Sequence, residues 1–520
     1  MSVVWESNLL SSGVSPELQA KMSDVIKECH NQGLDPFALA IEEYTADEIV
    51  ELAAYGGFPV RYPHFSFGQQ YETLHHQYHS GMGKIYEMVV NTDPTYMYLQ
   101  ANNPIVDNLT VVAHALAHSD FFKNNITFKH TDRNMMNIMS MHGQKIRRYM
   151  DMYGRRTVSS FLDACLSIDD LIDPALPWKT SSHSKPTKIT FDDPPEREHV
   201  PRIDTKDYLD KFVNPTQYIE QQREKNKTKR DKLKNKFPEK QERDILLFII
   251  NNERLKPWQQ NILSMIRDES VYYRPQILTK VMNEGWASYW DSYIMTKCGF
   301  AGDAGIFDYA KHHSSVLGGK YNMNNPYKLG NTLFNDIKTR WDKGQFGKEW
   351  ENCEDIREKR KWNLKLNKGR EKIFEVRENY CDTTFINEFF TKDFCMKHKF
   401  FEYQLEPYTN KYVVVSKDYK KIKQKLLKQY INGGKPIIYL EDARYRDTEM
   451  LLYHEFERDP LDINYVEGTL RMLYEIVQRP INIRTVKVSE KAAAFGHKTF
   501  LEKNPVIYRY DGVIFHTKLS

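Results

Sequence analysis

The strongest constraint in this sequence is an apolar stretch, from about Pro104 to Lys123, that contains two histidines four residues apart. Its apolar residues recur at helical spacing, so the stretch predicts a helix whose neighbours bury the histidine pair. Residues four apart lie on one face of a helix, about 6 Å apart along its axis. His114 and His118 can therefore bind one metal ion between them.

A second segment, VMNEGWASYWD at residues 281–291, places a carboxylate among apolar side chains. Burial of Glu284 costs free energy unless the carboxylate is paired or bound to a metal. Gly285 and Ala287 are small, so we expect another backbone to approach this segment closely. The segment therefore predicts a buried helix with a functional carboxylate.

Taken together, the two segments resemble the halves of a zinc site. VVAHALAH (111–118) is similar to the V-x-x-H-E-x-x-H helix of the gluzincin zinc aminopeptidases, and NEGWASY (283–289) resembles their N-E-G-F-A-x-Y helix. The resemblance implies that His114, His118 and Glu284 bind zinc. The chain departs from the peptidases at Ala115, where they have the general-base glutamate, and in the longer gap between the segments.

A broader resemblance covers most of the chain and identifies it as similar to the stage V sporulation protein R (SpoVR-like) family. Five segments carry it in the family's order: YPHFSFGQQYE (62–72), GKIYEMVVNTDPTYMYL (83–99), HALAHSDFFKNN (114–125), VMNEGWASYW (281–290) and NPYKLG (325–330). The resemblance implies a cytoplasmic protein of bacteria or their phages, with a genetic link to spore-cortex formation and no established activity. Many relatives have histidine at the position of Asp291.

If a metal binds, a residue other than Ala115 must activate the attacking water. The candidates for catalysis are Asp120, Asp291 and His313, with His64 and His312 as further possibilities. Asp291 lies seven residues after Glu284 on the same helical face, so it also fits a role in orienting a metal ligand. Each of these side chains taken alone is explained as well by a structural or exposed position.

Structural explanations of the three ligand residues stay open. His114 and His118 are compatible with two core histidines that form hydrogen bonds with neighbouring helices. Glu284 is compatible with a buried ion pair that needs no metal, in which an arginine or a protonated histidine such as His118 is the partner.

A third group of histidines lies in the sequence HHQYH, where His75, His76 and His79 have partial ligand spacing. The segment predicts an amphipathic helix that also carries Tyr71 and Tyr78. No acidic motif in the sequence pairs with these histidines, so the main site is the better metal candidate.

With 520 residues the chain is too long for one compact core, and two or three domains are expected. The fold class that we predict is a mainly α N-terminal region with a gluzincin-like helical core, followed by a smaller α/β (α+β) domain. The predicted segments are a helical domain at 1–172, a polar charged insertion or linker at 173–240, a helical continuation at 241–400 and the α/β domain at 401–520.

Composition limits the binding partners and the cellular location that we expect for this protein. A formal net charge of +4 in 520 residues is too small for a dedicated nucleic-acid binder. The six scattered cysteines are typical of reduced thiols, and neither a signal peptide nor a membrane span is evident, so we expect a cytoplasmic protein. The charged, aromatic segment YLEDARYRDTEMLLYHEFE in the C-terminal domain is a candidate surface for a protein partner, although an ordinary domain surface explains it equally well.

Two functions fit these observations. The first is a zinc-dependent hydrolase of amide or peptide-like bonds, related to spore-cortex or cell-envelope processes. The second is a non-catalytic scaffold or regulatory protein, in which Ala115 marks a degenerate peptidase-like site and the C-terminal domain binds a partner.

Overall fold

The computed structural model divides into two compact units. The first unit combines Met1–Val158 with Val271–Lys435, and the second combines Ser159–Ser270 with Pro436–Ser520. The structure describes residues 10–12, 14–80, 88–178, 215, 217–218, 220–221, 224, 236–318, 324–457, 459–492 and 499–519. Most of the predicted insertion at 173–240 lies outside the described residues.

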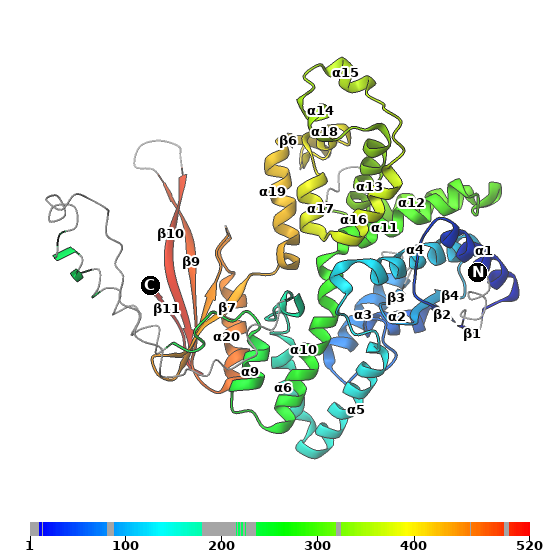
Figure 1. Cartoon of the computed structure of the whole chain (residues 1–520). Helices are drawn as coiled ribbons and strands as arrows, with labels where there is room; N and C mark the ends of the chain where they lie inside the picture. Colours follow the sequence, from blue (N-terminus) through cyan, green and yellow to red (C-terminus); the bar gives the residue numbers. More distant parts are fainter. Residues whose placement is uncertain are drawn as a thin grey trace, which may run out of the picture. The chain divides into compact units, whose positions relative to one another are not determined.

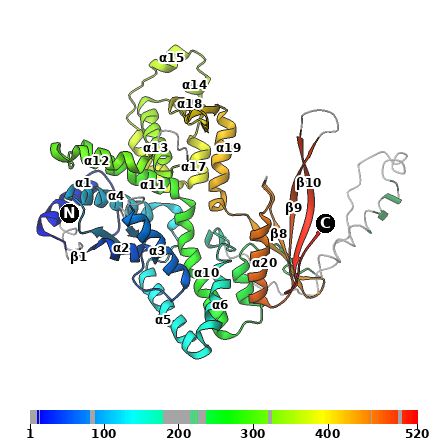
Figure 2. The same cartoon turned by 180° about the vertical axis from the view of Figure 1, so that it is seen from behind.

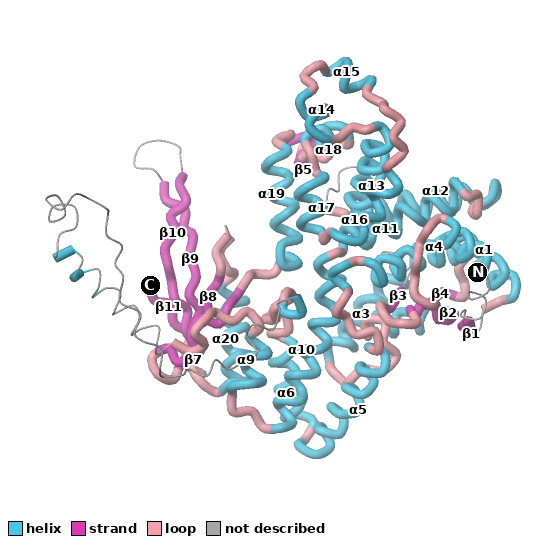
Figure 3. Tube along the Cα trace, in the orientation of Figure 1, coloured by secondary structure: helices cyan, strands magenta, loops and turns pink. Residues whose placement is uncertain are grey.

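The first unit is mainly helical (Figures 1 and 3). Its N-terminal part contains β1 (Leu10–Ser12), α1 (Pro16–Asn31), β2 (Leu39–Tyr44), α2 (Ala46–Ala54), α3 (Phe65–His79), β3 (Met88–Val90), β4 (Thr95–Gln100), α4 (Ile105–Asn124), η1 (Ile126–Phe128) and α5 (Met135–Tyr153). The chain leaves this unit within α6 (Arg155–Leu166) and returns within α10 (Pro257–Leu278).

The returning chain adds a second set of helices and one hairpin. These elements are α11 (Lys280–Ser292), the π-helix η3 (Tyr293–Lys297), α12 (Gly302–Leu317), α13 (Pro326–Lys343), α14 (Gly347–Asn352), α15 (Ile356–Lys361), α16 (Gly369–Asn379), α17 (Asp382–Phe389), α18 (Lys392–Lys397), β5 (Glu402–Glu406), β6 (Lys411–Ser416), α19 (Tyr419–Tyr430) and η4 (Ile431–Gly434).

A small sheet of order β1-β2-β4-β3 accompanies the N-terminal helices. β1 pairs with β2 and β2 with β4 in parallel, whereas β3 is antiparallel to β4. The sequence predicts a helical domain at 1–172, and the sheet was not predicted there. Its strands are short, and their alternation of buried and exposed residues is weak, which explains why the pattern did not reveal them.

Local capping signals set the boundaries of the first helices. The Ser15 side chain accepts a hydrogen bond from the Leu18 backbone at the start of α1. Thr45 and Glu48 form a capping box at the start of α2, each side chain accepting from the other's backbone N–H. Gly56 and Gly57 follow α2 with positive φ angles, and these prevent the helix from continuing.

The core of the first unit lies where α4, α11, α13 and α16 meet. α11 and α13 approach at two glycines: a Cβ on Gly285 would lie 2.4 Å from the Gly330 Cα atom, and a Cβ on Gly330 would lie 2.1 Å from the Val281 carbonyl oxygen. The close backbone approach that the small residues of the second segment predict is therefore confirmed.

The second unit contains a five-stranded sheet of order β11-β10-β9-β8-β7. Besides parts of α6 and α10, its elements are η2 (Leu176–Trp178), α9 (Ile245–Asn252), β7 (Ile438–Tyr445), β8 (Glu449–His454), α20 (Ile463–Val477), β9 (Ile481–Ala492), β10 (Thr499–Tyr510) and β11 (Phe515–Leu519). β8 and β9 are parallel because α20 crosses between them, and α20 packs on β9 and β10 (Figure 2).

The predicted fold class, mainly α with a smaller α/β domain near the C-terminus, is confirmed. The predicted boundary at residue 401 falls inside the first unit, which includes the β5–β6 hairpin and α19. β8 lies in the charged segment at 439–457 that the sequence suggests as a candidate partner surface. Among the described residues, none of the helices combines the length and apolar character needed to cross a membrane.

Candidate metal centre

The two histidines of the apolar stretch lie in the middle of α4, a helix enclosed on nearly all sides by the core of the first unit (Figure 1). His114 and His118 are each 5% exposed, and Ala115 between them is fully buried. Their rings lie 4.7 Å apart between centroids, so the spacing in the sequence brings both imidazoles to one face of the helix.

α11 supplies the carboxylate. Oε2 of Glu284 lies 3.8 Å from Nε2 of His114 and 3.5 Å from Nε2 of His118. The start of α11 is held in place by Asp382, whose carboxylate accepts hydrogen bonds from the backbone N–H groups of Val281 and Met282. The three residues singled out in the sequence therefore converge, within 4.8 Å of one another.

The other nitrogen of each imidazole faces an acceptor on α11. Nδ1 of His114 lies 2.6 Å from Oδ2 of Asp291, and Nδ1 of His118 lies 2.9 Å from Oδ1 of Asn283. A neutral imidazole that donates from Nδ1 has its lone pair on Nε2. Both lone pairs then point toward Glu284, in the arrangement that metal-binding histidines share.

These residues fit a transition metal ion. In a tetrahedral site with bonds of 2.0–2.1 Å, neighbouring ligand atoms are about 3.3 Å apart, close to the 3.5 and 3.8 Å found here. Two lone pairs and a carboxylate that converge in a buried space repel one another unless a cation or a shared proton lies among them. The donor set, two imidazoles and one carboxylate, is that of a three-ligand zinc site with an open position.

Asp291 connects the cluster to α12. Its Oδ1 accepts a hydrogen bond of 3.1 Å from the Tyr309 hydroxyl, which in turn lies 3.1 Å from Nδ1 of His313. Burial works to raise the pKa of Asp291, but the hydrogen bonds and charges of His114 and His313 outweigh it and hold the pKa below its ordinary value. Asp291 is therefore an anion that faces the far side of the His114 ring.

Asp120, another catalytic candidate from the sequence, has different neighbours. Its carboxylate accepts hydrogen bonds from the indole N–H of Trp286 at 2.9 Å and the backbone N–H of Asp35 at 2.8 Å, and Arg377 lies 3.4 Å away. Complete burial raises its pKa to about 6, partly offset by the Arg377 charge. These contacts connect α4 to α11 and α16.

The remaining candidates lie on other helices. His64 is the N-cap of α3, where its Nδ1 accepts from the Ser66 backbone. His312 and His313 both lie on α12, and His313 contacts the Asp291 network, with its Nδ1 3.1 Å from the Tyr309 hydroxyl and 3.6 Å from Oδ1 of Asp291. His75 and His79 lie on α3, where they face a different carboxylate.

Sequence reasoning missed three residues at the centre. Asn283 precedes Glu284 in the motif but was not assigned the role of orienting His118. Tyr309 lies one helical turn before His313, a spacing that signals a shared face. Tyr327, in the segment NPYKLG, has its ring centroid 6.3 Å from that of His114, and no local pattern signals this proximity.

Comparison with known proteins identifies the family of the chain. A profile of the family described as SpoVR like protein matches residues 14–435. The chain belongs to the SpoVR-like family. It is 27% identical over 461 residues to the uncharacterized protein YcgB of Escherichia coli (strain K12), covering 82% of this chain and 84% of YcgB. The residues 14–435 that match the family profile include His114, His118 and Glu284, whereas the gluzincin resemblance stays a prediction. No solved structure matches the chain significantly.

Proposed function

We propose that this SpoVR-like protein is a metal-dependent hydrolase of amide or peptide-like bonds, with zinc bound by His114, His118 and Glu284. The observation that carries the proposal is the convergence of both Nε2 atoms on one carboxylate oxygen, while both Nδ1 atoms face acceptors. Because the SpoVR-like family has a genetic link to spore-cortex formation, cell-wall peptides are the first substrates to test.

A bound divalent cation would supply Lewis acidity, which polarises the carbonyl of a scissile amide. The chain itself orients the ligands, because Asp291 and Asn283 fix which nitrogen of each imidazole carries the proton. Burial of the cluster keeps bulk water away and strengthens each electrostatic interaction within it.

His313 is the proton acceptor in this proposal. If its Nδ1–H donates to the Tyr309 oxygen and the Tyr309 hydroxyl donates to Asp291, the lone pair of His313 lies on Nε2. Its side chain is 21% exposed, in contrast with 7% for Asp291, so a substrate or water molecule can reach it. This role replaces the general base that Ala115 cannot provide.

Asp120 has a structural role in the proposal. Both of its oxygens are engaged by Trp286, Asp35 and Arg377, and together these contacts hold the backbone of α4 against α11. Tyr327 is a further candidate for contact with substrate, because a phenol beside His114 can donate a hydrogen bond to developing negative charge.

Metal analysis of the purified protein tests the site. The amount of transition metal that wild-type protein retains after dialysis should fall by about one equivalent in His118→Ala. His76→Ala is the matched control, because it removes an exposed histidine of α3 outside both clusters. A wild-type protein that cannot be loaded with any transition metal, although folded, would instead support a protonated His118–Glu284 ion pair.

Turnover tests the reaction. The metal-loaded protein should cleave members of a mixture of cell-wall peptides and N-acyl amides, followed by mass spectrometry. Glu284→Gln should abolish cleavage, and His313→Gln should lower kcat by about 10²–10⁴-fold, the usual contribution of general base catalysis. His313→Gln should retain its metal, which separates loss of proton transfer from loss of the site.

Ala115 favours a second candidate function, a non-catalytic scaffold whose peptidase-like site has decayed. A fully buried methyl group stands where a zinc peptidase of this pattern has its base. This hypothesis expects no turnover by wild-type protein, a partner that copurifies without metal, and activity gained on Ala115→Glu substitution. Turnover by the wild-type protein would exclude it.

A further inference from the structure

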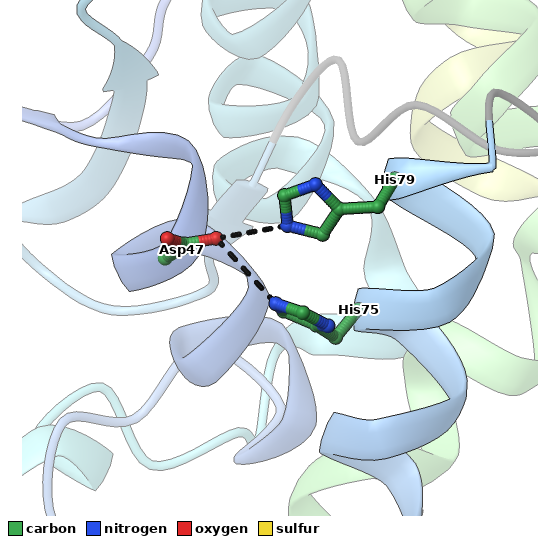
Figure 4. Close-up of side chains that lie close together, drawn as sticks. All are labelled: Asp47, His75 and His79. Atoms are coloured by element: carbon green, nitrogen blue, oxygen red, sulfur yellow. Dashed lines mark ion pairs between the residues drawn. The ribbon is translucent and has the colours of Figure 1, made fainter.

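A second histidine pair lies on the exposed helix α3, outside the candidate centre. His75 and His79 are four residues apart, so both rings lie on one face, with centroids 4.2 Å apart. No acidic motif in the sequence pairs with them. The fold supplies one, because α2 packs against α3 and brings Asp47 to the same face (Figure 4).

The three side chains converge on one point between the two helices. Oδ1 of Asp47 lies 3.4 Å from Nε2 of His79 and 3.9 Å from Nε2 of His75. Both nitrogens point at this same oxygen in Figure 4, and the three ligand atoms lie within 4.8 Å of one another. Both distances exceed the 3.2 Å expected of a good hydrogen bond, and they are close to the ligand separations of a tetrahedral ion.

The Asp47 carboxylate is not used by its own helix. The capping box of α2 is formed by Thr45 and Glu48, which satisfy each other's backbone N–H groups. Asp47 therefore faces α3 instead of closing the first turn. Its side chain is 64% exposed, in agreement with a carboxylate that is accessible to an ion from solvent.

The end of α3 adds a favourable field for a cation. His79 is the last residue of the helix and His75 lies one turn earlier, at the end of the helix dipole that carries partial negative charge. Tyr71 stacks on His75, with centroids 5.6 Å apart and planes 29° apart, so the ring has a packed neighbour on the helix surface. These features help to hold the imidazole in a conformation that faces Asp47.

We propose that Asp47, His75 and His79 form a second metal site, open to solvent, for a borderline divalent ion such as Zn²⁺. Imidazole ligands favour Zn²⁺, Ni²⁺ or Cu²⁺ over Mg²⁺ and Ca²⁺, which prefer oxygen donors. Three protein ligands leave a fourth position for water or for a donor group of another molecule. The site stands independently of the proposed function, since it shares no residue with the buried cluster.

Titration of the full-length, metal-free protein with Zn²⁺ against a chromophoric chelator tests the proposal. Wild-type protein should bind one equivalent more than His79→Ala, or bind that equivalent at least about tenfold more tightly. His76→Ala is the matched control, because it removes a neighbouring histidine from the same helix and should bind as the wild type does. The substitutions lie on exposed surface, and circular dichroism should show unchanged helix content.

Asp47→Asn provides the second arm, because it removes the charge and keeps the side-chain size. It should weaken the same equivalent that His79→Ala weakens, and leave the equivalent lost in His118→Ala unchanged. Identical zinc binding by wild type, His79→Ala and Asp47→Asn would overturn the proposal and leave an exposed ion pair only. If only the buried site does not bind zinc, wild type and His118→Ala should bind the same amount, while His79→Ala and Asp47→Asn still bind less than the wild type.

Discussion

The two histidine clusters of this protein have nearly the same geometry and opposite surroundings. In each, two histidines four residues apart on one helix face a single carboxylate oxygen from a second helix, at 3.5 and 3.8 Å in one cluster and 3.4 and 3.9 Å in the other. The side chains of His114 and His118 are 6% and 7% exposed, whereas those of His75 and His79 are 39% and 54% exposed.

The difference extends to what holds the rings. Asp291 and Asn283 fix the Nδ1 atoms of His114 and His118, while in the described part of the chain no hydrogen bond holds the Nδ1 atom of His75 or His79. Helical spacing is therefore enough to bring the ligand side chains together. Burial and orienting hydrogen bonds then determine how much conformational entropy these side chains lose when the metal binds. We expect the buried cluster to bind its ion more tightly.

Removal of the metal should produce the largest contrast between the clusters. An ion present at about 1,000 times its dissociation constant stabilises the folded state by ~4 kcal/mol. A chelator should therefore lower the free energy of unfolding by up to about this amount in the wild type and in His79→Ala, and by far less in His118→Ala. Thermal unfolding of each variant with and without zinc measures it, and equal shifts in all three would show that the clusters are equivalent or empty.

Glycine substitutions in the helices that carry the ligands should give the next largest contrast. A Cβ on Gly285 would overlap the Gly330 backbone, so Gly285→Ala should destabilise the first unit by ~1–3 kcal/mol or more. Gly68→Ala in α3 meets no atom within 4 Å and should instead stabilise by ~0.5–1 kcal/mol through helix propensity. Chemical denaturation measures both, and similar effects would mean that α11 and α13 are less closely packed than described.

The contrast also explains what the sequence revealed. His114, His118 and Glu284 were found because each sits in a long apolar context that makes a polar residue conspicuous. Helix starts such as Ser15 and the Thr45–Glu48 capping box were predictable because their signals are local.

Contacts between distant segments could not be predicted. Asp47 lies 28 residues before His75, in a capping-box sequence whose local explanation is already complete. Gly330 lies against Gly285, and Tyr327 lies beside His114, because of the way α13 packs on α11. The hydrophobic periodicity of a single helix does not specify which helices it packs against. The small N-terminal sheet was missed for the same reason, because its three-residue edge strands are defined by their pairing partners.

Loss of an orienting partner should weaken only the buried site. Asp291→Asn keeps an acceptor for Nδ1 of His114 but removes the charge, and it should lower zinc affinity about 10–100-fold. Asp47→Asn is the matched change at the exposed cluster, where the carboxylate is itself a proposed ligand. Competition titrations assign each loss to one equivalent, and an unchanged affinity in Asp291→Asn would argue against an orienting role for this carboxylate.

The buried cluster should also confer a pH dependence that the exposed one does not. Asp382 holds the start of α11, and its complete burial raises its pKa to about 7, although the hydrogen bonds from Val281 and Met282 and the charge of Lys280 oppose the shift. The nearby Glu284 charge adds to the increase. In the unfolded chain the same carboxyl has an ordinary pKa near 4.

Because the folded state retains this proton to higher pH than the unfolded state, the contribution of Asp382 to stability is complete below about pH 4 and decreases as the pH rises toward 7. One proton limits the slope to about 1.4 kcal/mol per pH unit. Denaturation of metal-free protein between pH 4 and 8 should show this slope in the difference between wild type and Asp382→Asn. His79→Ala should retain the wild-type profile, since the exposed cluster does not depend on a buried acid, and parallel profiles for wild type and Asp382→Asn would show that Asp382 is ionised throughout.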